Sequence, residues 1–252
     1  MYLENYPIVT LIVSCATLWL ATKAGGVLQK RWRPLAEEDR EDFRVVQGAA
    51  LTLLGLLLGF SFSMAVSRYD ERKNYEEAEA NAIGTEYVRA DLLSSSDASK
   101  VRELLKKYLD QRLLFYTTRD HAQVAKINAG TAELQSELWS AVRGPAGAQP
   151  TPITALAVSG MNDVLNSQGY TQAAWWNRLP SAAWLLLAGI AIGCNILIGY
   201  GSRGTHGVTL LVFPIAISIA LFLISDIDSP RRGLIRVAPQ NLLSLSQSFP
   251  AQ

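Results

Sequence analysis

Long stretches without a charged residue alternate with strongly charged stretches along this chain of 252 residues. Four of the uncharged stretches are also rich in large apolar side chains: residues 5–22, 45–67, 179–202 and 204–225. A helix needs roughly 20 apolar residues, at about 1.5 Å each, to cross a bilayer core of about 30 Å. The pattern therefore predicts four transmembrane helices.

A fifth uncharged stretch, residues 144–162, does not fit this description. It contains Pro145, Pro150 and Pro152, and the apolar residues after Pro152 recur at helical spacing instead of forming a continuous run. We therefore expect it to lie outside the membrane, with Thr151 capping a helix that begins at Pro152. The first apolar stretch has no basic residue before it, so we expect a retained helix and not a cleaved signal peptide.

The region between the second and third apolar stretches is predicted to be helical. The sequence has no proline from Ala36 to Gly144 and is rich in good helix formers. We expect one helix from about Glu41 to about Leu93, roughly 70 Å or more in length, whose second half projects into water. Its acidic residues alternate with basic ones, which favours a solvent-facing surface of i,i+4 ion pairs over a metal site.

The predicted architecture is all-α: a polytopic membrane protein with a helical bundle continuous with its second and third spans. Residues 1–67 hold the first two spans and a basic connecting loop, and residues 68–178 form a helical region outside the membrane. Residues 179–226 hold the last two spans, and residues 227–252 form a C-terminal tail on the same side as the helical region. Basic residues divide evenly between the two sides, so they do not orient the chain. Trp175 and Trp176 are expected to anchor the membrane interface.

The composition and the missing motifs argue against several classes of function. The chain carries 23 basic and 22 acidic residues, a net charge of +1, so nothing favours a nucleic-acid partner. Two cysteines and two histidines, without metal-site spacing, argue against zinc or a disulfide scaffold. No phosphate-binding loop, nucleophile elbow or metalloprotease motif occurs in the sequence. We therefore expect neither an enzyme nor a cofactor.

The second span holds the candidate functional residues. Gly55 and Gly59 form a GxxxG pair, with Ser63 one step further along the same stripe. Small residues of this kind let helices approach closely in lipid. The partner is either another span of the same subunit or the same span of another copy.

A different stripe of the same span is apolar and recurs at helical spacing: Leu53, Leu56, Leu57, Phe60 and Met64. A ring of these side chains from several subunits would form a hydrophobic constriction that gates by dewetting. The alternative is that they face lipid or the core of their own subunit. Polar candidates for a pore lining are Ser61, Ser63, Asn81 and Thr85.

Three blocks of the sequence resemble the bacterial bestrophin-like membrane proteins, a family distantly similar to the bestrophin anion channels. The blocks are GLLLGFSFSMAVSRYDERK, EAEANAIGTEYVRADLL and DIDSPRRGLIRVAPQNLLSL, and the resemblance covers essentially the whole chain. It implies a pentameric channel in the bacterial inner membrane, with a pore lined by the second span. It also implies that both termini and the helical region lie in the cytoplasm.

The resemblance also bears on metal binding. Bestrophins carry a Pro-Phe-Gly segment with acidic residues after the last span, which contributes to calcium sensing in animal members. Asp226, Asp228, Pro230 and Gly233 occupy a comparable place here, without the phenylalanine or the dense acidic run. Asp226 and Asp228 are therefore weak metal candidates, and we expect no metal site.

Two functions remain. The first is a homo-oligomer, pentameric by resemblance, that passes small inorganic ions, anions in preference, through a hydrophobic neck. The second is a non-conducting membrane scaffold or sensor that signals through its cytosolic helices. The lipid bilayer is an expected partner in both. The channel also needs other copies of the chain, whereas the scaffold or sensor predicts a monomer or dimer with a cytosolic partner.

Overall fold

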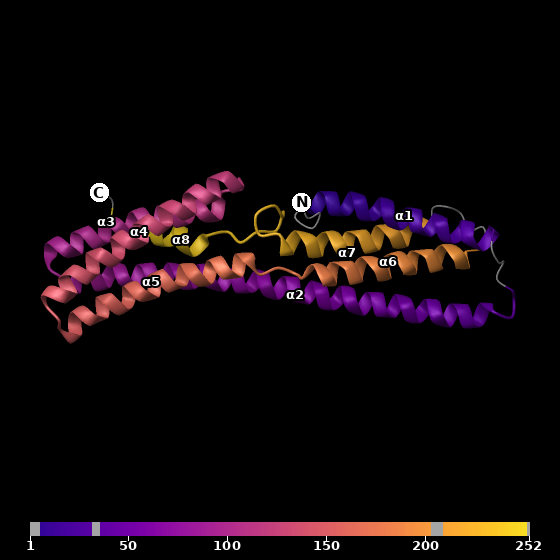
Figure 1. Cartoon of the computed structure of the whole chain (residues 1–252), viewed down its shortest axis with the longest axis horizontal. Coiled ribbons are helices and arrows are strands. Elements are labelled where there is room, and N and C mark those ends of the chain that lie inside the picture. Colours follow the sequence, from indigo (N-terminus) through magenta and orange to yellow (C-terminus); the bar gives the residue numbers. More distant parts are fainter. Residues whose placement is uncertain (1–5, 32–35, 203–208, 251–252) are drawn as a thin grey trace. The chain divides into compact units, whose positions relative to one another are not determined.

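The computed structural model describes residues 6–31, 36–202 and 209–250, which form helices and connecting segments without a strand (Figure 1). The helices are α1 (Pro7–Arg31), α2 (Arg40–Arg89), α3 (Ser95–Thr117), α4 (His121–Ala148), α5 (Pro152–Trp176), α6 (Ser181–Gly201), α7 (Val212–Asp228) and α8 (Gln240–Ser248). Short 3-10 turns span Ala90–Leu92 and Thr209–Leu211. The predicted all-α class is confirmed.

Three helical stretches are long and apolar enough to cross a membrane: Pro7–Arg31, Arg40–Leu92 and Pro152–Gly201. They contain the first three predicted spans. The fourth predicted span begins in residues that lie outside the described ranges, and α7 has 17 residues against the roughly 20 that a bilayer needs. The fourth crossing therefore stays a prediction.

The chain divides into two compact units. The first unit comprises residues 1–68 and 178–236, and the second comprises residues 69–177 and 237–252. Helix α2 runs unbroken for 50 residues, about 75 Å, and contributes to each unit. The division into two units is based on how the helices pack and not on where a membrane lies. The expected membrane boundaries near residues 67, 178 and 226 therefore stay predictions.

In the first unit, α1 packs against α6 and α7. The closest approach of α1 and α6 is made by Gly25 and Gly199. A Cβ at Gly25 would overlap the Ile196 carbonyl, and one at Gly199 would overlap the Thr22 carbonyl. Asn195 adds a polar contact here, because its Oδ1 accepts a hydrogen bond from Thr22 Oγ1 at 3.3 Å. Glycine is therefore required on both helices for this crossing.

Helix α2 joins the first unit through one stripe of small and apolar residues. Leu54, Ser61 and Ala65 are buried there, at the spacing that places side chains on one helix face. Leu54 belongs to the same cluster as Leu187 and Cys194 of α6. The remaining circumference of α2 in this unit is largely exposed or half-buried.

The second unit is built on α3, which packs against α4 and α8. An apolar stripe of α3 with helical spacing faces this core, and all its members are buried: Val101, Leu104, Leu105, Tyr108 and Leu109. Ile83 of α2, Leu138 of α4 and Met161 of α5 complete the same core.

Side-chain caps and a tolerated proline set three helix boundaries. Thr151 caps α5 in a capping box with Thr154, as expected. Ser94 caps α3, and its hydroxyl accepts the backbone N–H of Asp97. Helix α4 continues past Pro145 to Ala148, because a proline in the last turn removes only one helical hydrogen bond.

The two adjacent tryptophans have different surroundings. Trp176 is exposed, which is compatible with an interfacial anchor. Trp175 is 5% exposed and packs against Phe115 and Tyr116, with ring centroids 4.9 and 5.4 Å away. Its expected anchoring role is wrong, because the side chain belongs to the core of the second unit.

The close crossing of α1 and α6 yields a stability prediction. Gly199→Ala should destabilise the protein by about 1–3 kcal/mol, because the added methyl group meets backbone that cannot rotate away. Gly193→Ala on the same helix is the matched control, since nothing lies within 4 Å of a Cβ there. The measurement is the thermal midpoint of each variant in detergent. Equal midpoints would contradict the close approach.

Candidate functional site along helix α2

Four of the five predicted neck residues lie on a face of α2 that the described residues leave largely exposed. Leu53, Leu56, Phe60 and Met64 are 47%, 53%, 60% and 45% exposed. Leu57 differs from the prediction, because it is half-buried and packs against the apolar core of its own unit. On a helix with about 100° between residues, this face points away from the buried stripe of Leu54 and Ala65. The stripe is therefore free to meet lipid, a pore or another subunit.

The glycine stripe of α2 is also uncovered. Gly55, Gly59 and Ser63 are exposed, and no described residue lies within 4 Å of a Cβ built at either glycine. The described residues therefore do not show these glycines packed against another span of the same subunit, which was one of the two alternatives. Any close approach at these glycines involves another molecule.

The four polar pore candidates do not share one environment. Ser63, Asn81 and Thr85 are exposed on α2. Ser61 is 8% exposed and lies on the buried stripe with Leu54. Ser61 thus faces the core of its own unit, because it stands about 100° around the helix from Phe60.

In the second unit, the buried stripe of α2 carries charges. Its buried charged members are Arg72, Glu76, Glu79 and Glu86, each at most 1% exposed. The expected surface of i,i+4 ion pairs is therefore wrong for these residues. They lie in register with Leu54 and Ala65, so the face that packs in the first unit also packs here. The helical spacing between these charged residues and the apolar residues Leu54 and Ala65 was the sequence signal that could have identified them as buried.

Glu79 is the centre of a polar network in the core of the second unit. Arg112 of α3 forms an ion pair with it, and both side chains have no exposed surface. Tyr116 Oη and Thr171 Oγ1 donate hydrogen bonds to Glu79 Oε2 at 3.2 and 3.0 Å. Burial and the Glu79 charge raise the pKa of the Tyr116 hydroxyl, so it remains a donor. The network joins α2, α3 and α5.

Two further charges of the stripe complete the ends of other helices. The Arg72 guanidinium donates to the carbonyl oxygens of Ala174 and Asn177 at 3.2 and 3.0 Å, where α5 ends. Glu76 accepts the backbone N–H of Leu242 at 2.9 Å and the side-chain amide of Asn241 at 2.6 Å, where α8 begins. A cation at a helix C-terminus and an anion at an N-terminus are both stabilising.

Glu86 differs from the other charges in the stripe. Its side chain is fully buried, and neither carboxyl oxygen has a hydrogen-bond partner among the described residues. It lies against Gly160, where a Cβ would overlap its Oε2. Burial raises the pKa of Glu86 from 4.5 to about 8; Arg89 partly opposes this rise, and Asp163 adds to it. The carboxyl group is therefore mostly protonated at neutral pH.

The two weak metal candidates hold a loop of the first unit in place. Asp226 accepts the backbone N–H groups of residues 234 and 235 at 2.7 and 2.8 Å. Asp228 accepts the Leu179 N–H at 3.1 Å and faces Arg68 Nη1 at 3.8 Å. In the part of the chain that the structure describes, no group of three or more His, Cys, Asp or Glu side chains is placed to hold a metal ion.

These features define a helical protein with apolar, membrane-length helices and one long helix whose outer face is uncovered. A family model for the bestrophin-like domain matches residues 16–242. The chain belongs to the bestrophin-like family. A search of curated proteins finds no match.

Solved structures show the same fold. A bestrophin homologue from Klebsiella pneumoniae, crystallised as a tryptophan-to-alanine variant, has a TM-score of 0.65 and 13% identity, covering 96% of this chain and 98% of that one. The same homologue, phased with zinc, has a TM-score of 0.64 and 15% identity, covering 96% and 99%. A structure described as a leucine-to-alanine variant of a membrane protein has a TM-score of 0.63 and 14% identity, covering 94% and 99%.

The buried ion pair gives a second stability prediction. Arg112→Met should destabilise the protein by about 3–5 kcal/mol, because Glu79 then stays buried without its cation. Lys107→Met is the matched control on the same helix. Lys107 pairs with Glu103 at an exposed site, where water and salt screen the pair, so its loss should change the stability little. Chemical unfolding curves of both variants provide the measurement, and similar losses would disprove a special role for the buried pair.

Glu86 gives a pH prediction. Its folded-state pKa is raised, so between about pH 4.5 and 8 the folded protein holds a proton that the unfolded chain has lost. Stability should therefore fall as pH rises through this window and change little above it. Glu86→Gln should remove that part of the pH dependence, whereas the exposed Glu77→Gln should keep it. Thermal midpoints measured from pH 5 to about pH 9 test this, and an unchanged slope in Glu86→Gln would refute it.

Proposed function

We propose that copies of this chain assemble around an axis formed by α2 and conduct small ions, anions in preference, through a hydrophobic neck. The observation that carries the proposal is the uncovered apolar face of α2. Phe60 is its largest member and is 60% exposed. Large apolar side chains that their own subunit does not cover must contact either lipid or another subunit. Membership of the bestrophin-like family favours another subunit.

The neck acts by excluding water. A narrow ring of side chains such as Leu56, Phe60 and Met64 does not wet, so a hydrated ion meets a barrier there. Turning or spreading the helices widens the ring and admits water. Opening therefore requires only that α2 moves, with no chemical step.

Assembly is supported by the second uncovered stripe. The exposed Gly55 and Gly59 allow another helix backbone to approach closely. The bestrophin-like fold supports an oligomer, and we propose a pentamer from the family resemblance. We further propose that the protein lies in the bacterial inner membrane with both termini in the cytoplasm.

The neck side chains carry no charge, so selectivity must arise elsewhere along α2. Ser63, Asn81 and Thr85 are exposed and offer O–H and N–H donors to an anion. Asp70 and Glu77 are also exposed on α2 and would attract cations. The reversal potential in a salt gradient measures which group prevails, and a cation-selective value would overturn the anion preference.

Currents in planar bilayers test the neck. Phe60→Ala should increase the single-channel conductance severalfold, because it removes the bulkiest side chain of the proposed ring. Phe62→Ala is the matched control: the same change, two residues away, on roughly the opposite side of the helix. Phe62→Ala should leave the conductance near that of the unchanged protein.

Three outcomes would contradict the proposal. An unchanged conductance in Phe60→Ala would remove that residue from the neck, and a larger effect of Phe62→Ala would move the pore to another face of α2. A folded protein that never conducts, and whose mass in detergent corresponds to a monomer or dimer, would favour the scaffold or sensor function.

A further inference from the structure

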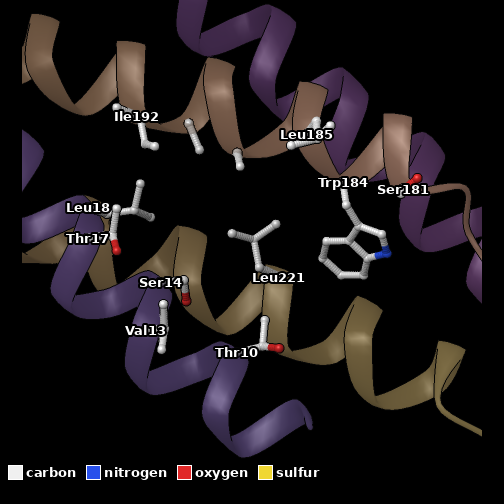
Figure 2. Close-up of a pocket in the computed structure, with 12 residues that line it drawn as sticks. Thr10, Val13, Ser14, Thr17, Leu18, Ser181, Trp184, Leu185, Ile192 and Leu221 are labelled. Carbon is white, nitrogen blue, oxygen red and sulfur yellow. The ribbon is translucent and has the colours of Figure 1, made fainter. Parts of the chain in front are cut away.

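A pocket of about 470 Å³ lies in the first unit between α1 and α6, with α7 behind it (Figure 2). In Figure 2, Trp184 and Leu221 project into the space between the helices, and Leu18 and Ile192 lie at its other end. The pocket is lined almost entirely by apolar atoms. Its size falls within the range of pockets that bind small ligands, roughly 300–1,000 Å³.

The pocket follows from how α1 and α6 cross. The helices run in the same direction and touch at Gly25 and Gly199, where there is no room for a side chain larger than a hydrogen atom. Toward their N-termini they diverge, and Thr10 and Ser181 line the opened end. The close crossing at one end therefore creates the cavity at the other.

The pocket lining includes a few polar groups. The Trp184 indole nitrogen is buried and makes no hydrogen bond to any described residue. Ser14 Oγ donates to the Leu11 carbonyl at 3.1 Å and Thr10 Oγ1 lies 3.4 Å from Ser225 Oγ. Thr17 and Ser181 add two further hydroxyls to the lining. A buried, unpaired N–H is unfavourable, so the pocket is suited to a ligand with one hydrogen-bond acceptor.

A positive charge lies near the open end. The Arg232 guanidinium lies 4.0 Å from the ring centroid of Tyr6, the residue that precedes α1. The Thr10 N–H donates to the Tyr6 carbonyl at 2.9 Å, so Arg232 lies about one helical turn from the pocket lining. Arg232 is exposed and can contact an anion at this end.

We propose that this pocket holds an acyl chain of an anionic phospholipid from the bilayer. The chain fills the space between α1 and α6, an ester carbonyl oxygen accepts the Trp184 N–H, and the phosphate pairs with Arg232. The apolar lining, the unpaired Trp184 N–H and the nearby cation match the three parts of such a lipid. The site lies away from the α2 neck residues, so it stands independently of ion conduction.

The test uses purified protein in detergent, with phosphatidylglycerol or phosphatidylcholine added. The unchanged protein should retain phosphatidylglycerol in native mass spectrometry, and its thermal midpoint should rise more with this lipid than with phosphatidylcholine. Ala188→Phe should abolish both effects, because Ala188 lines the pocket and the larger side chain fills it. Ala182→Phe is the matched control on the same helix, at an exposed position outside the lining, and should keep both effects.

Two further variants separate the parts of the site. Arg232→Gln should bind the two lipids alike, since the preference comes from its charge. Trp184→Phe should weaken retention roughly two- to tenfold, the effect of one hydrogen bond. Circular dichroism confirms that each variant is folded.

Three results would overturn the proposal: no lipid retained by the unchanged protein, equal retention by Ala188→Phe, or no preference for the anionic lipid. A cysteine introduced at Leu185 that cross-links to a second subunit would show instead that another copy of the chain covers the pocket.

Discussion

The structure depends on a single buried stripe of α2 whose chemistry changes along the helix. In the first unit the stripe consists of small and apolar residues such as Leu54 and Ala65. In the second unit the same face presents charges, and the buried Glu79 carboxylate is compensated there by an ion pair with Arg112 and by hydrogen bonds from Tyr116 and Thr171. Since this face carries the fully buried residues of α2 in the first unit, the exposed side that bears Phe60 is left for contacts outside the subunit.

The features that could be predicted from the sequence are those that a local rule controls. Charges are costly in a bilayer core, so their absence marks apolar helices without knowledge of any partner. The lack of proline from Ala36 to Gly144 predicted the length of α2 closely, because nothing in that region breaks a helix. The α3 stripe was predictable for a similar reason, since periodicity identifies a shared face.

The features that could not be predicted depend on distant partners. Periodicity places Glu76 and Glu79 on one face, but it does not say whether that face meets water. Their partners lie far along the chain: Leu242 is 166 residues from Glu76, and Arg112 is 33 residues from Glu79. The GxxxG motif pointed to Gly55 and Gly59, whereas the close helix crossing within the chain uses Gly25 and Gly199, neither of which belongs to a GxxxG pair. A motif search cannot find such a pair, because each glycine contacts a helix far away in sequence.

The crossing of α1 and α6 has a consequence for biosynthesis. Thr22 meets Asn195, which lies 173 residues later in the chain. At about 5–20 residues per second, the ribosome needs roughly 9–35 s to produce that partner. During this interval the Thr22 hydroxyl can donate to the Leu18 carbonyl of its own helix, as it does in the folded chain at 3.0 Å. Asn195 has a similar bond from its side-chain amide N–H to the Ala191 carbonyl at 2.8 Å, which satisfies part of its hydrogen bonding before the Thr22 helix and its own helix meet.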